Sequence, residues 1–142
     1  MARQKALVWL LRPAPTGVEV LLLERPERRG GGYHPVTGKA DEGEAPAACA
    51  VREAHEETGL KGELFDLEYH HVFYESRGQR KLEEHAFLLV VLPGSEPELS
   101  SEHVGARWAE AGDARVSIEW PAHREALDRA LALWDRVRAR AS

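Results

Sequence analysis

The feature that most constrains this chain is one predicted helix whose start and end are both marked in the sequence. Pro46 suits a first helical turn, because the N–H group that proline lacks would have no partner there. No helix-breaking residue follows up to Thr58, and Gly59 then provides a typical helix end. We therefore predict an α-helix over residues 46–58.

The predicted helix carries three acids on one face. Glu53, Glu56 and Glu57 are spaced i, i+3 and i+4, so their carboxylates are neighbours. Like charges in this arrangement repel, whereas a divalent cation would reverse the sign of the interaction, and oxygen ligands suit Mg²⁺ or Mn²⁺. We therefore expect a metal-binding helix. Its other side is expected to pack on a sheet through a small apolar stripe: Ala47, Ala50, Val51 and Ala54.

The spacing of residues 38–60 resembles the Nudix box, the sequence motif of the Nudix hydrolases. The pattern is G-x5-E-x7-R-E-U-x-E-E-x-G-U, where U is apolar, and the chain has every fixed residue: Gly38, Glu44, Arg52, Glu53, Glu56, Glu57 and Gly59. Leu60 fits the last apolar position, and Ala54 is smaller than the usual residue at the other. A merely solvated acidic helix would explain neither this register nor the glycines. The resemblance implies a one-domain α/β enzyme, an α/β/α sandwich around a mixed β-sheet.

The resemblance also implies a metal site. Glu53, Glu56 and Glu57 would share metal binding, and one of the three carboxylates would assist in removing a proton from water. The sequence leaves open which carboxylate does so. Gly38 would bring its backbone carbonyl close to the metal, where a Cβ would interfere.

Three further residues of the motif are expected to support this site. Arg52 would orient the acids by pairing with Glu44 or Glu56. For that reason we expect Arg52 to be one of the catalytic residues. Glu44 would also stabilise the junction between loop and helix, and Gly59 would end the helix.

An additional acid from beyond the motif is expected on the same grounds. Glu83 and Glu84 lie near the start of a strand predicted over 82–92, and neighbouring strand residues point to opposite faces. We favour Glu84 as a catalytic and metal-binding residue, because it matches the glutamate that opens this strand in the resembling enzymes. Glu83 is the alternative, and Glu102 is the third candidate.

Apolar patterning predicts the remaining elements. Strands are expected over 6–11, 18–23, 60–74 and 106–108, and an amphipathic helix over 122–138. Core packing is expected for Trp134, and packing is favoured over contact with a base for Trp108 and Trp120. His70 and His71 are adjacent in a strand, so they should point to opposite faces.

Three residues form the predicted substrate-binding set. Arg25 ends a strand just before the basic segment 28–32, and its guanidinium suits a phosphate group. Lys39 lies within the motif, and Tyr74 offers a ring on which a base could stack.

Composition narrows the partners and the compartment. A chain of 142 residues suits one domain, 1–142, and a net charge of −5 argues against a general nucleic-acid or membrane surface. The single Cys49 excludes an intramolecular disulfide and fits a reducing compartment. No targeting segment or membrane-length apolar run is found, so we expect a cytoplasmic protein that binds a small nucleotide. A homodimer is left open.

The substrate is predicted from a finer resemblance. Residues 33–44 resemble the matching stretch of bacterial dihydroneopterin triphosphate pyrophosphatases, also known as dATP pyrophosphohydrolases, which release pyrophosphate from a triphosphate. Dinucleoside polyphosphates of the Ap4A type stay open as alternatives. ADP-ribose is disfavoured, because no proline follows the motif before Pro93. A non-catalytic nucleotide-binding regulator is disfavoured, because every acid of the motif is present.

Overall fold

The structure, a computed structural model, describes residues 2–75, 80–101 and 103–141, so Glu102 lies outside the described residues. The strands are β1 (Arg3–Ala14), β2 (Gly17–Glu24), β3 (Tyr33–His34), β4 (Val36–Lys39), β5 (Glu63–Glu75), β6 (Arg80–Val90) and β7 (Gly105–Glu110). The helices are α1 (Pro46–Thr58), α2 (Ala111–Ser117) and α3 (Pro121–Ala141), and a 3₁₀ turn, η1, spans Glu27–Arg29.

Within the described residues, seven strands form one mixed sheet around β1. The order is β3-β2-β1-β6-β5, with β4 added to β1 and β7 added to β2. β1 runs parallel to β6 from the pair Arg3 and Leu82 to the pair Leu11 and Val90, and its pairings with β2 and β4 are antiparallel. β1 and β2 are covered on both faces of the sheet, which explains the nearly continuous apolar runs 6–11 and 18–23.

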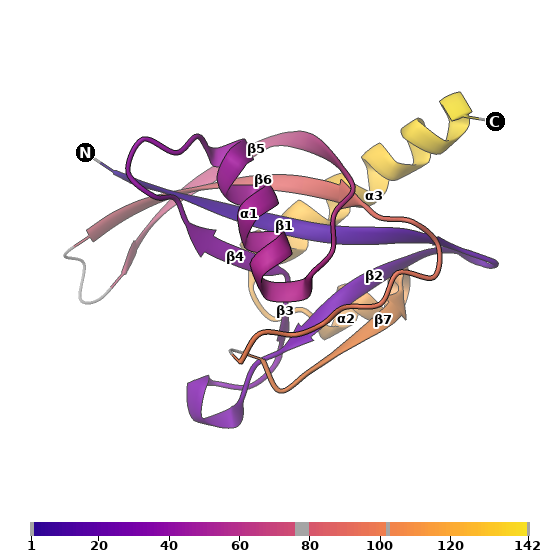
Figure 1. The fold of residues 1–142 in the computed structure, drawn as a ribbon, viewed down its shortest axis with the longest axis horizontal. Helices are drawn as coiled ribbons and strands as arrows, with labels where there is room; N and C mark the ends of the chain where they lie inside the picture. Colours follow the sequence, from indigo (N-terminus) through magenta and orange to yellow (C-terminus); the bar gives the residue numbers. More distant parts are fainter. Residues whose placement is uncertain (1, 76–79, 102, 142) are drawn as a thin grey trace.

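Alternation along β1 divides the core into two layers. Ala6 and Val8 pack with the buried residues of α1. Leu7 and Trp9 pack with residues of α2 and α3, and the Trp9 indole N–H donates to the backbone oxygen of His123 at 3.0 Å. Figure 1 shows α1 in front of the sheet and α3 behind it. The expected α/β/α sandwich with a mixed sheet is therefore confirmed.

α1 begins and ends as predicted. Pro46 is its first residue, and Gly59 follows its last residue with a left-handed φ of 73°. The Gly59 N–H donates to the His55 carbonyl at 2.8 Å, which satisfies a backbone oxygen at the helix end.

The prediction of which face of α1 is buried is partly wrong. Ala50 and Ala54 are fully buried as expected, but Ala47 is exposed and Val51 is 45% exposed. The buried face instead consists of Cys49, Ala50, Ala54, Glu57 and Thr58. The reason is that α1 packs on β4 as well as on β1, so the protein also covers the side of the helix that carries acids.

Two further observations complete the fold. No pattern in the sequence predicts α2, a short helix that contains Gly112 and Asp113, both weak helix formers. Ala114 nevertheless anchors it in the core. No helix in the described part of the chain is long and apolar enough to cross a membrane.

The packing of α3 is tested by replacing its buried tryptophan. Trp134 is 3% exposed, as predicted for a core residue. Trp134→Ala is expected to lower the free energy of unfolding by about 3–5 kcal/mol, because it removes a large side chain from a filled core. Trp120 is 59% exposed, so Trp120→Ala is the control and should change that free energy by less than about 1 kcal/mol. Urea unfolding followed by circular dichroism measures both; equal losses would contradict this assignment of the core.

Candidate active site

The three acids of α1 are not equivalent in the structure. Glu57 is 4% exposed, and the side chain of Glu53 is 16% exposed. Glu56 faces outward, with 55% of its side chain exposed. One oxygen of Glu57, Oε2, is buried without a hydrogen-bond partner among the described residues. Glu53 and Glu57 therefore form the inward pair, and Glu56 lies at its outer side.

Arg52 holds the acids and the loop that precedes α1. Its guanidinium donates to both oxygens of Glu44, each at 2.8 Å, so the predicted pairing with Glu44 is present. It also lies 2.9 Å from Glu53 and 3.1 Å from Glu56, and it donates to the backbone oxygen of Lys39 at 3.1 Å. The hydrogen bonds from Arg52 lower the pKa of Glu44 to about 2 and raise the pKa of Arg52 itself.

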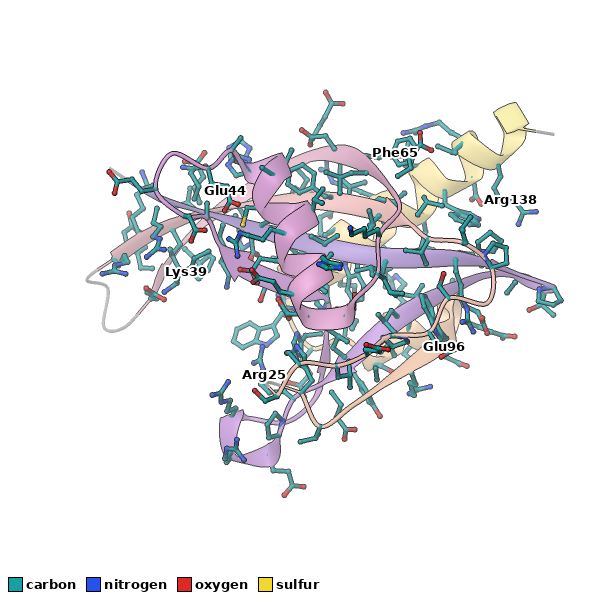
Figure 2. All side chains as sticks on the ribbon, in the orientation of Figure 1. Arg25, Lys39, Glu44, Phe65, Glu96 and Arg138 are labelled. Atoms are coloured by element: carbon teal, nitrogen blue, oxygen red, sulfur yellow. The ribbon has the colours of Figure 1, made fainter. Side chains whose placement is uncertain are left out.

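Glu44 also fixes the loop itself. Its side chain accepts a hydrogen bond from the backbone N–H of Asp41 at 3.0 Å. Figure 2 shows Glu44 beside the first turn of α1, as expected for a residue at the junction between loop and helix.

Gly38 lets β4 approach the acid pair. A Cβ at this position would lie 2.1 Å from the carboxyl carbon of Glu53, so no other residue fits without displacing that side chain. The Gly38 carbonyl accepts a weak hydrogen bond from the buried Cys49 thiol, with 3.5 Å between sulfur and oxygen. That this carbonyl also approaches a metal stays a prediction.

The charge state of the inward pair bears on metal binding. Burial, followed by the neighbouring Glu57 carboxylate, raises the pKa of Glu53 to about 7. Arg52 offsets part of this negative charge through its 2.9 Å ion pair with Glu53. The described residues contain no group of three His, Cys, Asp or Glu side chains arranged to hold a metal ion, and Glu56 pairs with Arg52 at 3.1 Å. The pair of oxygen donors and the unpartnered Oε2 nevertheless fit a hard divalent cation.

Two cavities lie next to each other, and Glu57 lines the smaller one. The smaller, about 110 Å³, is lined by Arg25, Arg29, His34, Thr37, Glu57 and His103. The larger, about 490 Å³, is lined by Lys5, Arg25, Thr37, His71, Phe73, Tyr74, Glu84, Trp120, Ala122 and His123. Arg25 and Thr37 line both, so the cavity at Glu57 and the aromatic cavity on the α3 side adjoin at these two residues.

The predicted substrate-binding residues divide between this site and its surroundings. Arg25 lines both cavities, and Tyr74 lines the larger one. Lys39 lines neither of them, and its ammonium forms a 2.9 Å ion pair with Glu75. In Figure 2, Arg25 and Lys39 lie well apart, with Lys39 on the β4 side of α1. Packing was the favoured prediction for Trp120, and it is wrong: this ring is exposed and forms part of the wall of the larger cavity.

Glu84 and Glu83 point to opposite faces of β6, as alternation predicts. Glu84 shares its face with Ala86, which packs on the α3 side, and its carboxylate accepts a hydrogen bond from His71 at 2.8 Å and pairs with Lys5 at 3.7 Å. Glu83 lies on the other face, next to Gln4. The prediction that Glu84 shares a metal with the acids of α1 stays a prediction, and its contacts in the structure are basic.

Several residues that line the cavities are not among the predicted site residues. Lys5 could have been found from its alternation with Leu7 in β1, which places it on the α3 side of the sheet. His103 and His123 are brought in from distant segments and carry no signal of their own. Burial lowers the pKa of His123 to about 4, so this imidazole is neutral in the cavity near neutral pH.

Comparison with known proteins identifies the relatives of this chain. The model of the NUDIX domain family matches residues 1–130. The chain is 37% identical over 115 residues to an octanoyltransferase of Myxococcus xanthus; the match covers 80% of this chain but 32% of that protein, so the chain spans about a third of its length.

Solved structures share the fold. An Ap4A hydrolase of C. elegans, in a binary complex, has a TM-score of 0.77 at 24% identity, covering 93% of this chain and 97% of that one. The dihydroneopterin triphosphate pyrophosphohydrolase of E. coli has a TM-score of 0.74 at 23% identity, covering 89% and 92%. At such identities, these two likenesses establish the fold alone.

The close approach of β4 to α1 can be tested by a double-mutant cycle. Gly38→Ala is expected to lower the free energy of unfolding by about 1–3 kcal/mol, because the new methyl group overlaps the Glu53 carboxyl group. In a Glu53→Ala background this cost should largely disappear, since the overlapping atoms are gone. Gly112→Ala is the control: an added Cβ meets nothing within 4 Å, so this change should be neutral or stabilising. An equal cost of Gly38→Ala in both backgrounds would contradict the assignment.

Proposed function

This chain belongs to the Nudix hydrolase family, and from that premise we propose that it hydrolyses a phosphoanhydride bond of a small nucleotide with the help of Mg²⁺ or Mn²⁺. The observation that carries the proposal is the inward pair of Glu53 and Glu57. Glu57 lines the smaller cavity, which shares Arg25 and Thr37 with the larger, aromatic one. An acid pair at one end and a ring-sized cavity at the other match a ligand with phosphates at one end and a heterocycle at the other.

Glu53 and Glu57 are the proposed inner ligands of the cation, with Glu56 at their outer side and the Gly38 carbonyl opposite. A divalent cation bound there supplies charge neutralisation of the diphosphate and a more acidic water. The residues of the chain hold the carboxylates in place: Arg52 contacts both Glu53 and Glu56. Because all of its ion-pair partners among the described residues are acids of α1 or of the preceding loop, Arg52 acts on ligand geometry and does not contact substrate.

Arg25 is the proposed phosphate ligand. It lines both cavities, so a phosphate chain that runs from Glu57 to the aromatic cavity must pass its side chain. Arg29 lines the smaller cavity and can contact the outer phosphate. Guanidinium groups bind phosphate oxygens bidentately, which also fixes the direction of the chain. Lys39 stays a weaker candidate, because it is paired with Glu75.

The larger cavity is the proposed site of the heterocycle. Its volume of about 490 Å³ lies within the usual range for small-ligand sites, and Phe73, Tyr74 and Trp120 offer aromatic surfaces for stacking. A nucleoside-triphosphate-like compound of the dATP or dihydroneopterin triphosphate type, cleaved with release of pyrophosphate, is the substrate that this arrangement supports best. Ap4A-type dinucleotides and ADP-ribose are the alternatives, and a non-catalytic regulator is disfavoured by the complete set of acids.

Glu84 is better supported at the heterocycle end than at the metal. Its carboxylate and the Lys5 ammonium lie side by side in the larger cavity, one accepting hydrogen bonds and the other donating them. A ring edge with adjacent N–H and carbonyl groups offers the complementary pattern. The role at the metal implied by the family resemblance is the alternative, and the two roles give different mutant phenotypes.

Loss of the inner acid should abolish most turnover. Glu57→Gln is expected to lower kcat about 100-fold to 1,000-fold, because one charged ligand at the reacting phosphate is lost. Excess chelator should reduce wild-type activity to background. The assay is release of phosphate or pyrophosphate from a panel of triphosphates, dinucleoside polyphosphates and nucleotide sugars, with products identified by mass spectrometry. The exposed Glu63→Gln is the control. Full activity in chelator, or in the Glu57 variant, would refute the proposed function.

Replacing Glu84 should change substrate preference more than chemistry. Glu84→Gln is expected to lower kcat/KM about 10-fold to 100-fold for the best substrate, since a hydrogen bond to a charged group is worth about 1.5–3 kcal/mol. The loss should be smaller for substrates whose rings lack an N–H donor. Glu83→Gln, on the other face of the same strand, is the control and should match wild type. If Glu84→Gln instead weakens Mn²⁺ binding to the free protein, the metal role is correct and the ring-binding role is not.

A further inference from the structure

A buried histidine contacts the inner acid of α1 from a distant part of the chain. His103 Nε2 lies 2.9 Å from Glu57 Oε1, and the two side chains are 4% and 5% exposed. An ionised carboxylate can only accept a hydrogen bond, so Nε2 carries the proton and donates it. We propose that His103 is a positioning residue that holds Glu57 in the orientation needed to bind a divalent cation. This inference rests on the proposed function, in which Glu57 is a metal ligand.

The contact leaves one carboxylate oxygen for the cation. Oε1 of Glu57 is occupied by His103, whereas Oε2 has no hydrogen-bond partner within the described residues although it is buried. A buried carboxylate oxygen without a partner is costly unless a ligand completes it. Glu57 also lines the smaller cavity together with Arg25. Anchoring one oxygen thus fixes the rotation of the carboxyl group and leaves the other available.

The segment that carries His103 is itself fastened to the end of α1. The backbone N–H of Glu98 donates to the Thr58 carbonyl at 2.8 Å, and that of Ser100 donates to the Glu57 carbonyl at 3.2 Å. On the far side, the Val104 N–H donates to the Glu24 carbonyl at 3.1 Å. These bonds cross between α1 and β2, so the position of His103 is set by main chain on both sides.

A second histidine lies beside the first. The ring of His34 lies 5.0 Å from that of His103, and its Nδ1 donates to the carbonyl of Pro35. Burial lowers the pKa of His34 to about 4, so its ring is neutral near neutral pH and does not repel His103 or draw the Glu57 carboxylate away. His103 Nε2 thus lies at hydrogen-bonding distance from Glu57 Oε1 without competition from a charged His34.

The test measures Mn²⁺ binding to the full chain without substrate, by the loss of the free-ion electron paramagnetic resonance signal. His103→Phe keeps ring volume but removes the donor, and it is expected to weaken Mn²⁺ binding about 10-fold to 100-fold, the usual cost of losing a group that orients a metal ligand. His103→Gln places an amide N–H near the position of Nε2 and should recover part of the affinity. His85→Phe is the control: His85, on β6, lies 2.7 Å from the side-chain oxygen of Gln4 on β1, and its replacement should leave Mn²⁺ affinity unchanged.

A purely structural role predicts a different result. In that case His103→Phe would lower the free energy of unfolding in urea while the folded protein bound Mn²⁺ with wild-type affinity, and the inference would be overturned. Glu57→Gln in the same titration separates the two proposals. If Glu57→Gln loses Mn²⁺ binding and His103→Phe does not, only the role of His103 fails. If neither variant changes the affinity, the metal site assigned to α1 is wrong, and the role of His103 fails with it.

Discussion

The interactions of Arg52 are the constraint on which the site depends. One guanidinium reaches Glu44 in the loop, Glu53 and Glu56 on α1, and the backbone oxygen of Lys39 at the end of β4. It therefore ties the strand, loop and helix together at the point where Gly38 brings them into contact. The same positive charge offsets the repulsion among carboxylates that would otherwise weaken α1. Arg52 lies beside the acids and lines neither cavity. Its charge lets the inward pair of Glu53 and Glu57 remain close together.

Local signals predict the limits of α1 but not its orientation. Pro46 and Gly59 mark its ends through backbone chemistry that depends on few neighbours. Which face is buried depends on the direction from which β4 approaches, and no residue within the helix encodes that direction. Val51 is therefore exposed, although it belongs to the predicted packing stripe, and the acid Glu57 is buried.

The same limit applies to residues that are distant in sequence. Alternation correctly predicts that Glu83 and Glu84 face opposite sides of β6, yet which side meets α1 depends on the whole sheet. The pairing of His103 with Glu57 spans 46 positions and arises because the segment before β7 crosses the end of α1. Trp120 illustrates the converse error. Packing was favoured for this tryptophan, but its position just before α3 exposes the ring at a cavity wall.

The sharing of only a few lining residues between the two cavities has an evolutionary consequence. Among the described residues, Arg25 and Thr37 are common to both cavities, and the rest of the larger cavity comes from β1, β5, β6 and the start of α3. None of its lining residues belongs to α1. Substitutions that reshape the ring-binding end can therefore accumulate without touching the acids or Arg52. Under the proposed function, descendants of such a chain can acquire new substrates while the acids assigned to the phosphates stay unchanged.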